Sequence, residues 1–213
     1  FSEAYFNAER MRKLRQTPVA DGGDPVAARF VPLSRPSLGP EEEMAVLKIL
    51  RSGWLTSGHQ IAAFEQAFSQ TVSAAHTVAV NSCTAAIHLC LADIGVRPGD
   101  EVISTPITWA STGNTLLHMG ARIVFVDVEP DTLNLDPAQV EGAITERTKA
   151  IIPVHLAGHP CDLEALHALA QRHDIALIED AAHALGAHYG GTPIGGDSTY
   201  ACFSFYSIKN ITT

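Results

Sequence analysis

The chain has 213 residues, 46% of them hydrophobic and 17% charged, which is typical of a globular protein with a sizeable core. We therefore expect one large domain, or one domain with an appendage. The 14 lysine and arginine residues against 23 aspartate and glutamate residues give a formal net charge of -9. Because nucleic-acid-binding surfaces are basic, this charge argues against a nucleic acid as a partner.

The four cysteines are far apart and form no CxxC pair: Cys83, Cys90, Cys161 and Cys202. They indicate neither a zinc site nor a disulfide framework, and we expect reduced, mostly buried thiols. No apolar run approaches the ~20 residues needed to span a bilayer, and the first residues lack the apolar core of a signal peptide. These features together predict a cytoplasmic protein that neither spans nor binds a membrane.

Residues 1–30 show no sustained periodicity and are interpreted as an N-terminal extension, so the folded domain is expected to cover 31–213. A first helix is expected to open at Pro40, because proline suits the first turn of a helix and the acids at 41–43 suit its N-terminus. Its buried stripe is expected to consist of Met44, Leu47 and Leu50. A second helix is expected to carry Ile61, Phe64 and Phe68.

Beyond this helix, short apolar runs alternate with helical patterns. The expected strands are the runs at 76–80, 101–105, 122–128, 150–156, 175–180 and 201–206. Two of the intervening helices are signalled by a cap at Asp136 with Pro137, and by helical spacing of Leu163, Leu166, Leu169 and Ala170. Strand alternating with helix predicts an α/β fold, in which a mostly parallel sheet is sandwiched by helices.

Ligands of such sheets bind outside the carboxyl ends of the strands, where this chain has several polar residues and one aromatic residue. They are Asn81 to Thr84, Thr105, Thr108, Trp109, Asp127, His155, Asp180, His183, Ser204 and Lys209. The set contains candidates for an anion-binding turn, an aromatic plate, a buried carboxylate and a reactive amine. Pyridoxal phosphate requires these groups, because it needs an amine to hold it, a carboxylate beside its pyridine nitrogen and a site for its phosphate.

Lys209 follows the last apolar strand, where its side chain can turn back over the sheet edge, although a lysine taken alone at such a place is more often a solvated surface residue. Asp180 ends the apolar run IALIED and, when ionised, would keep the pyridine nitrogen protonated. Its alternative role is to cap the segment that follows. Glu179 points to the opposite side by strand alternation and is the weaker candidate.

The segment NSCTAA puts free backbone amides and the hydroxyls of Ser82 and Thr84 at the start of a helix, and such a terminus attracts phosphate. Ser204 can add a further hydroxyl to the same phosphate. The alternative is simple capping by Asn81 or Ser82. Trp109 can lie against the pyridine ring or, alternatively, pack in the core.

His183 lies three residues after Asp180 and can reach the ring or the ring hydroxyl of the cofactor. The spacing of His155 and His159 falls on a strand and a turn rather than on one helix face, so we expect no metal site. No GxGxxG motif opens a helix after the first strand, which argues against dinucleotide binding.

Eight segments cover nearly everything from Ser34 to Thr213, in the order SRPSLG, SGWLTSG, AVNSCTAAIHL, GDEVISTPITWAST, VFVDVEPDTLNLDP, TKAIIPVHLAGHP, IALIEDAAHALGAHY and ACFSFYSIKNIT. They resemble the sugar-nucleotide aminotransferases of the DegT/DnrJ/EryC1/StrS family. SRPSLG, ITWAST, EDAAHA and SIKNIT resemble in particular its UDP-4-amino-4-deoxy-L-arabinose aminotransferase branch. The resemblance implies the large domain of fold-type I pyridoxal-phosphate aminotransferases.

The resemblance also implies a role for each candidate residue. Lys209 holds the cofactor and carries protons, Asp180 contacts the pyridine nitrogen, and Trp109 stacks on the ring. His183 lies near the ring hydroxyl, where relatives often have glutamine. The phosphate is held by Thr84, Ser204 and the backbone of Ser82 and Cys83. Cys83 itself stands where relatives usually have glycine or alanine, which is expected to tighten this turn.

The implied reaction moves an amino group from an amino acid, expected to be glutamate, to a keto-sugar nucleotide, expected to be a UDP-4-keto-pentose. We expect a homodimer, because relatives build each site from two subunits. Relatives also continue into a smaller C-terminal domain, which we expect to be absent from this chain. Two alternatives stay open. One is the same chemistry on another keto-sugar nucleotide or a keto-cyclitol, and the other is a truncated protein that binds the cofactor but is not an enzyme.

Overall fold

The computed structural model describes residue 32 and residues 34–212, so the expected extension at 1–30 lies outside the described residues. The chain divides into two units, Phe1–Arg35 and Pro36–Thr213, and all the described helices and strands belong to the second. The helices are α2 (Pro40–Ser52), α3 (His59–Val72), α4 (Cys83–Asp93), α5 (Ala110–His118), α6 (Pro137–Ala143), the 3-10 helix η3 (Leu156–Gly158) and α7 (Leu163–His173). The strands are β1 (Glu101–Ser104), β2 (Arg122–Phe125), β3 (Thr148–Ile152), β4 (Ala176–Asp180), β5 (His188–Tyr189), β6 (Thr192–Pro193) and β7 (Tyr200–Cys202).

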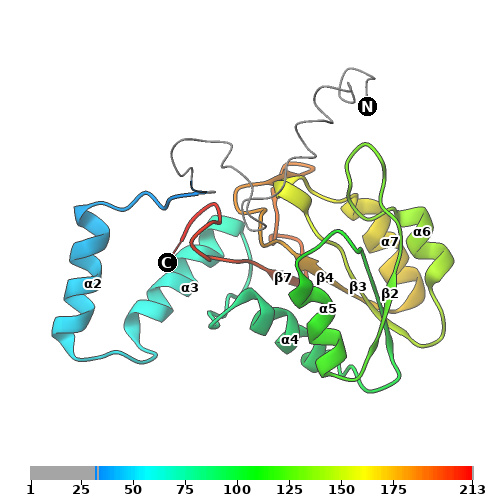
Figure 1. Cartoon of the computed structure of the whole chain (residues 1–213), viewed down its shortest axis with the longest axis horizontal. Coiled ribbons are helices and arrows are strands. Elements are labelled where there is room, and N and C mark those ends of the chain that lie inside the picture. Colours follow the sequence, from blue (N-terminus) through cyan, green and yellow to red (C-terminus); the bar gives the residue numbers. More distant parts are fainter. Residues whose placement is uncertain (1–31, 33, 213) are drawn as a thin grey trace, which may run out of the picture. The chain divides into compact units, whose positions relative to one another are not determined.

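Five of the described strands form one parallel sheet in the order β2-β1-β3-β4-β7, and β5 and β6 form a separate antiparallel hairpin. Figure 1 shows α4 and α5 on one side of the sheet and α6 and α7 on the other. Because side chains alternate along a strand, neighbouring residues enter opposite cores. Val102 packs in the core that contains α4 and α5, whereas Ile103 packs in the core that contains α6 and α7. The predicted parallel sheet with helices on both faces is confirmed.

The helices on the α6 and α7 side form where the sequence predicts them. Asp136 and Asp162 each accept a backbone N–H at the start of α6 and α7, over 2.8 and 3.1 Å, which satisfies a donor that the helix itself leaves free. The predicted apolar stripe of α7 is buried: Leu163, Leu166, Leu169 and Ala170. Capping and burial of one face together explain why this segment is a helix.

The expected strand at 76–80 is wrong, because these residues pair with no other described strand. The N–H of Ala79 donates instead to the carboxylate of Glu65 on α3 over 2.7 Å, and Val78 is 74% exposed. A strand forms only where a neighbouring strand supplies backbone partners. The other expected strands form, most of them shorter than expected.

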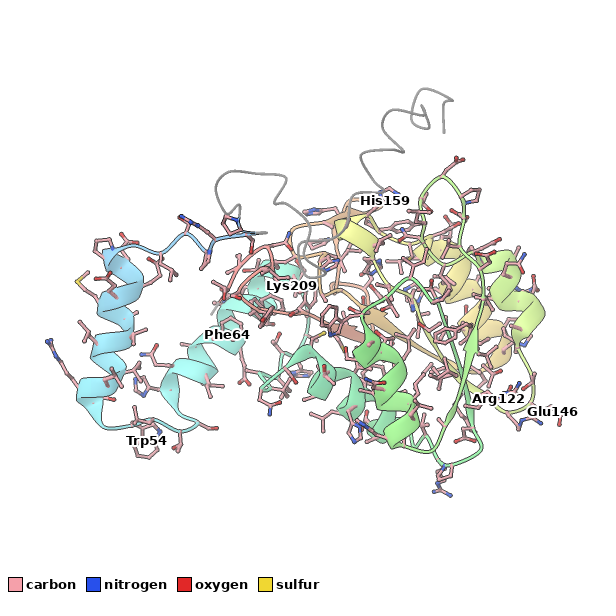
Figure 2. All side chains as sticks on the ribbon, in the orientation of Figure 1. Trp54, Phe64, Arg122, Glu146, His159 and Lys209 are labelled. Atoms are coloured by element: carbon pink, nitrogen blue, oxygen red, sulfur yellow. The ribbon has the colours of Figure 1, made fainter. Side chains whose placement is uncertain are left out.

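The expected burial of one face of α2 is also wrong. Its start is as predicted, with Pro40 in the first turn and the Glu42 carboxylate accepting the N–H of Gly39 over 2.6 Å. The three expected core residues are instead exposed: Met44, Leu47 and Leu50. Trp54, which follows this helix, is exposed as well (Figure 2). Periodicity predicts which residues share a helix face, but it does not predict whether another element covers that face.

Aromatic residues of α3 contact the segment that follows β7. Phe64 and Phe68 pack edge-on against Phe205, with ring centroids 5.2 and 5.4 Å apart, and Phe68 packs edge-on against Phe203 at 5.0 Å. Such edge-to-face pairs are favourable beyond the area that they bury. The cluster packs the stretch after β7, which leads to Lys209, against α3.

The four cysteines form no disulfide, as expected, with Cys161 and Cys202 buried and Cys83 and Cys90 half-buried. Within residue 32 and residues 34–212, every helix is too short or too polar to cross a membrane.

Candidate active site

The carboxyl end of β4 carries a buried acid. Asp180 ends this strand and is 5% exposed. Its Oδ1 accepts the N–H of Ala182 over 3.2 Å, and its Oδ2 accepts the hydroxyl of Thr112 from α5 over 3.2 Å. Burial raises the pKa of Asp180, and these two hydrogen bonds oppose that effect. Asp180 therefore caps the segment that follows it, as the alternative interpretation expects, although this segment is a turn. The hydrogen bond from Thr112 in addition holds the carboxylate on the α5 side of the sheet.

Lys209 and His183 are in direct contact. Lys209 lies in a turn after β7, where its N–H donates to the carbonyl of Tyr206 over 2.8 Å. Its Nζ is 2.7 Å from Nε2 of His183, in the turn after β4. Burial lowers the pKa of His183, the charge of Lys209 lowers it further, and the charge of Asp180 raises it. A neutral imidazole nitrogen accepts a hydrogen bond from an ammonium group, which is the arrangement seen here.

Cys83, the first residue of α4, contacts the strand next to Asp180. Its thiol donates to the carbonyl of Cys202 over 3.5 Å, and Cys202 is the residue that pairs with Asp180 between β7 and β4. Burial raises the pKa of the Cys83 thiol to about 12, with the charge of Asp180 acting in the same direction and the charge of Lys209 opposing it. The charges of the acid and the lysine therefore both act at the first residue of α4.

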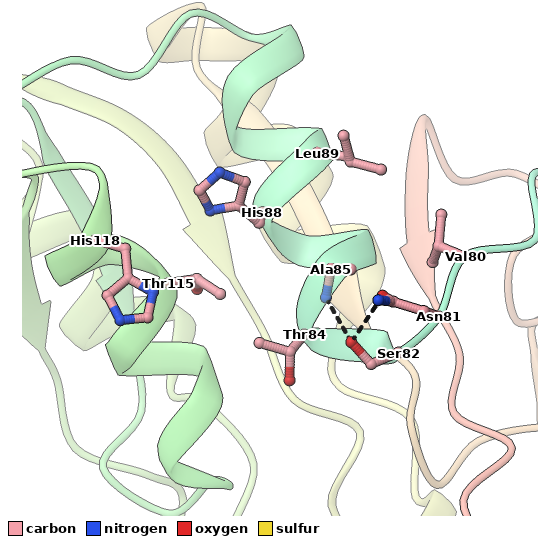
Figure 3. A pocket seen from close by; sticks show the side chains of 9 residues that line it. All are labelled: Val80, Asn81, Ser82, Thr84, Ala85, His88, Leu89, Thr115 and His118. Carbon is pink, nitrogen blue, oxygen red and sulfur yellow. Dashed lines mark hydrogen bonds between the residues drawn. The ribbon is translucent and has the colours of Figure 1, made fainter.

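The start of α4 carries the hydroxyls predicted to bind phosphate. Ser82 accepts the N–H of Ala85 over 3.1 Å, so the capping expected as an alternative is present. Ser82 and Thr84 line a hollow of about 550 Å³ beside α4 and α5 (Figure 3), which neither Asp180 nor Lys209 lines. The first amides of a helix have no carbonyl partner within that helix, and Ser82 takes that of Ala85, which leaves the amides of Cys83 and Thr84 to face an anion.

Trp109 and Ser204 lie at the predicted strand ends, but no hydrogen bond among the described residues joins either of them to another candidate. Trp109 immediately precedes α5 and is 79% exposed, so its alternative role in the core is wrong. The hydroxyl of Ser204 accepts the N–H of Tyr206 over 3.4 Å. An exposed tryptophan at the end of a strand is available to contact a ligand.

Glu179 lies on the other face of β4, as strand alternation predicts. One of its carboxylate oxygens is 2.9 Å from Nε2 of His155, and the other accepts the hydroxyl of Ser198. The N–H of Cys161 donates to Nδ1 of His155 over 3.0 Å. Because Nδ1 accepts a hydrogen bond, the ring proton is on Nε2 and is donated to Glu179. Residue spacing gives no sign of this network, because its members come from different parts of the chain.

Thr112 is the site residue that the sequence did not reveal. Its side chain is fully buried and contacts both the Asp180 carboxylate and the hydroxyl of Thr108, which is 2.8 Å away. The only available signal was the spacing of two threonines four residues apart at a helix start, which puts them on one face. Within the described part of the chain, no group of three or more His, Cys, Asp or Glu side chains is arranged to hold a metal ion.

The model of the DegT/DnrJ/EryC1/StrS aminotransferase family matches residues 36–213. The chain is 48% identical over 184 residues to the spore coat polysaccharide biosynthesis protein SpsC of Bacillus subtilis (strain 168), a match that covers 86% of this chain and 47% of SpsC. It is also similar to the PLP form of Spr1654 from Streptococcus pneumoniae, which is described as a sugar aminotransferase. That structure has a TM-score of 0.83 and 38% identity, over 86% of this chain and 51% of the other. DesI, solved in the presence of its TDP-sugar product, has a TM-score of 0.80 and 35% identity, over 88% of this chain and 48% of DesI.

The chain therefore spans about half the length of these relatives. Spr1654 has been solved in forms with PLP and with PMP, in agreement with the cofactor that the residues predict. The family match begins where the second unit of the chain begins and includes every candidate residue. The chain belongs to the DegT/DnrJ/EryC1/StrS aminotransferase family, whose cofactor is pyridoxal phosphate.

Proposed function

We propose that this chain is the cofactor-binding part of an aminotransferase that moves an amino group from glutamate to a keto-sugar nucleotide, a UDP-4-keto-pentose. The observation that carries the proposal is the 2.7 Å contact between Lys209 and His183, three residues beyond the buried carboxylate of Asp180. Family membership supports the class of reaction. The TDP-sugar product of DesI supports an acceptor that is carried on a nucleotide, and the likeness to one branch of the family supports the pentose.

The residues fit pyridoxal phosphate by their chemistry. The cofactor presents a phosphate, a pyridine nitrogen and a carbonyl carbon, which call for an anion-binding turn, a carboxylate and an amine. The start of α4 offers free amides and the positive end of the helix dipole. Asp180 offers the carboxylate and Lys209 the amine, and the charges of both act on Cys83 at that same helix start.

Lys209 is assigned two tasks, which are to hold the cofactor covalently and, once released, to move a proton as general acid and base. His183 accepts a hydrogen bond from Nζ of Lys209 through Nε2, which holds the lysine nitrogen in place for both tasks. Asp180, held ionised, keeps a proton on the pyridine nitrogen. When bound, the cofactor supplies an electron sink for the carbon that loses its proton.

The remaining candidates bind the cofactor without moving protons. Trp109 covers one face of the pyridine ring with its exposed side chain. The phosphate is bound by the hydroxyls of Thr84 and Ser204 and by the backbone of Ser82 and Cys83, because charge-assisted bonds to an anion are stronger than neutral ones.

We further propose that residues 31–213 form the large domain of a cytoplasmic homodimer, preceded by an extension at 1–30. Leu89 on α4 and Leu117 on α5 are 52% and 62% exposed, and apolar side chains on the helices beside the site support a covering second subunit. Sedimentation is expected to show a dimer. A monomer with full activity would contradict this assembly.

The test of the reaction is the visible absorption band of the protein-bound cofactor. Pyridoxal phosphate is expected to give this band, and glutamate is expected to remove it as the pyridoxamine form appears. Adding a UDP-4-keto-pentose should then restore the band and yield an amino sugar. A band that glutamate does not change would reject the aminotransferase and support a protein that only binds the cofactor. Turnover with other keto sugars or keto-cyclitols, and not with the pentose, would reject the acceptor alone.

Two aspartate variants provide a matched pair for this assay. Asp180→Asn removes the charge beside the pyridine nitrogen and is expected to abolish the response to glutamate. Asp174→Asn is the control, because Asp174 is exposed after α7 and its φ of 52° is one that asparagine tolerates. A normal glutamate response in the Asp180 variant would exclude the assigned role.

A further inference from the structure

The carboxylate of Asp180 is held by two donors from distant parts of the chain. Oδ1 accepts the N–H of Ala182 in the following turn, and Oδ2 accepts the hydroxyl of Thr112 from α5. Thr112 is 0% exposed, so water does not compete for its hydroxyl. Its second contact is the hydroxyl of Thr108, at 2.8 Å. Asp180 therefore ends a buried row of hydroxyl groups.

Proton counting sets the direction of the bonds in this row. A hydroxyl has one proton to donate, and an ionised carboxylate can only accept. Thr112 therefore donates to Asp180, and Thr108 donates to Thr112. Thr108 is itself placed by the turn after β1, where the hydroxyl of Thr105 accepts a backbone N–H over 3.0 Å. The row runs from Thr108, beside Trp109, through Thr112 to Asp180. The orientation of the Asp180 carboxylate therefore depends on how the start of α5 is placed.

The surroundings of Asp180 show why this donor matters. Burial raises the pKa of Asp180, and the hydrogen bonds from the N–H of Ala182 and the hydroxyl of Thr112 lower it, with smaller effects in the same direction from the nearby His183 and His155. A hydroxyl that donates to the charged form favours that form over the neutral one. Among these groups, Thr112 alone combines full burial with a side-chain bond to the carboxylate.

We propose that Thr112 is a positioning residue, which keeps Asp180 ionised and fixed in one orientation for the pyridine nitrogen of the cofactor. The proposal rests on the proposed function for the identity of that cofactor. On the sides of α4 and β7 the acid faces the thiols of Cys83 and Cys202, whose raised pKa values keep them neutral. The two thiols therefore add no charge beside the acid, and the hydroxyl of Thr112 is the buried side-chain donor to its carboxylate.

The test is a pH titration of Asp180 in the cofactor-free chain. The titration is monitored by NMR of protein labelled with carbon-13 at the aspartate carboxyl groups. Asp180→Asn assigns the signal. Thr112→Val keeps the side-chain shape and removes the hydroxyl, so Asp180 should bind a proton roughly tenfold more tightly than in the wild type. Thr112→Ser restores the donor and should restore the wild-type titration. A folded Thr112→Val variant that titrates like the wild type overturns the proposal.

Thr115→Val is the matched control on the same helix. Thr115 is 1% exposed, and its hydroxyl donates to the backbone carbonyl of Thr112 over 2.9 Å rather than to the acid. Its titration should equal that of the wild type, and a shift as large as that of Thr112→Val would refute a specific role. If Thr112→Val does not fold, Thr108→Val should give a smaller shift in the same direction, and no shift refutes the proposal. Failure of the wild type to bind pyridoxal phosphate would refute the proposed function, whereas the titration would still decide what Thr112 does.

Discussion

Replacing His155 with leucine would break the buried network on the α6 and α7 side of the sheet. The side chains of His155 and Glu179 are 0% and 1% exposed, and their polar atoms are 2.9 Å apart. Leucine keeps an apolar body of similar size but donates no hydrogen bond. The carboxylate of Glu179 would keep the hydroxyl of Ser198 as its remaining donor, and the N–H of Cys161 would lose its acceptor.

The expected cost follows from the burial of both partners. A buried polar group left without its hydrogen-bond partner typically costs about 1–3 kcal/mol, and more when it is charged. His155→Leu affects two such groups, the carboxylate of Glu179 and the N–H of Cys161, so we expect a total cost of about 3–5 kcal/mol. This is a large part of the ~5–15 kcal/mol that stabilises a typical domain. At about 2 kcal/mol per molar urea, the midpoint of unfolding should fall by about 2 M.

Urea unfolding followed by circular dichroism measures this cost. The double variant His155→Leu/Glu179→Leu should be more stable than His155→Leu alone, because it leaves no buried charge without a partner. The control is Arg172→Ala, which removes an ion pair with Glu141 whose partners are 57% and 53% exposed, and it should cost less than about 1 kcal/mol. A cost below about 1 kcal/mol for His155→Leu, or a double variant that is less stable than this single one, would refute the reasoning.

Asp180→Asn should increasingly stabilise the cofactor-free chain, relative to the wild type, as the pH rises. Burial raises the pKa of Asp180 above 3.8, so its protonated form contributes stability that is complete below that value and is lost as the pH rises through the folded-state pKa. Thermal melts of the two proteins should therefore diverge from acid to neutral pH, and a constant difference would disprove this. Leu166→Ala in the core under α7 should cost about 2–5 kcal/mol, whereas Leu47→Ala on the exposed face of α2 should cost about 0.5 kcal/mol or less. Chemical unfolding of both variants checks the order, and equal costs would contradict the assigned core.

The parallel sheet and its covering helices could be predicted because both cores are built from local patterns. The stripe from Leu163 to Ala170 has helical spacing and is buried, and the run that ends at Asp180 is apolar up to its last two residues. The chain also alternates strand with helix, which leaves a parallel sheet as the main way to bury both faces. These features are local, so the sequence is enough to recognise them.

The two failures concern segments whose burial depends on a distant partner. Residues 76–80 have the composition of a strand, but Glu65 takes the backbone N–H of Ala79 and no described strand lies beside it. The apolar face of α2 has helical spacing, yet Leu50 and its neighbours on that face are exposed. Spacing along the chain specifies the face of an element and leaves its partner undetermined.

The site was predictable in part for the same reason. The rule that ligands bind at the carboxyl ends of parallel strands selects Asp180, His183 and Lys209 together, and the structure places His183 against Lys209. The bond from Thr112 to Asp180 joins residues that are 68 positions apart, and two threonines in a helix are ordinary in a sequence. Such a pairing becomes visible only when the helix is docked on the sheet.

The central claim is that Lys209 is the amine that holds pyridoxal phosphate. The most direct measurement is to treat the cofactor-bound chain with borohydride, digest it and locate the attached cofactor by mass spectrometry. The label is predicted on the peptide that contains Lys209, absent from Lys209→Ala and unchanged in Lys149→Ala, which alters an exposed lysine of β3. A label on another lysine, or one that persists in Lys209→Ala at the wild-type level, would contradict the account.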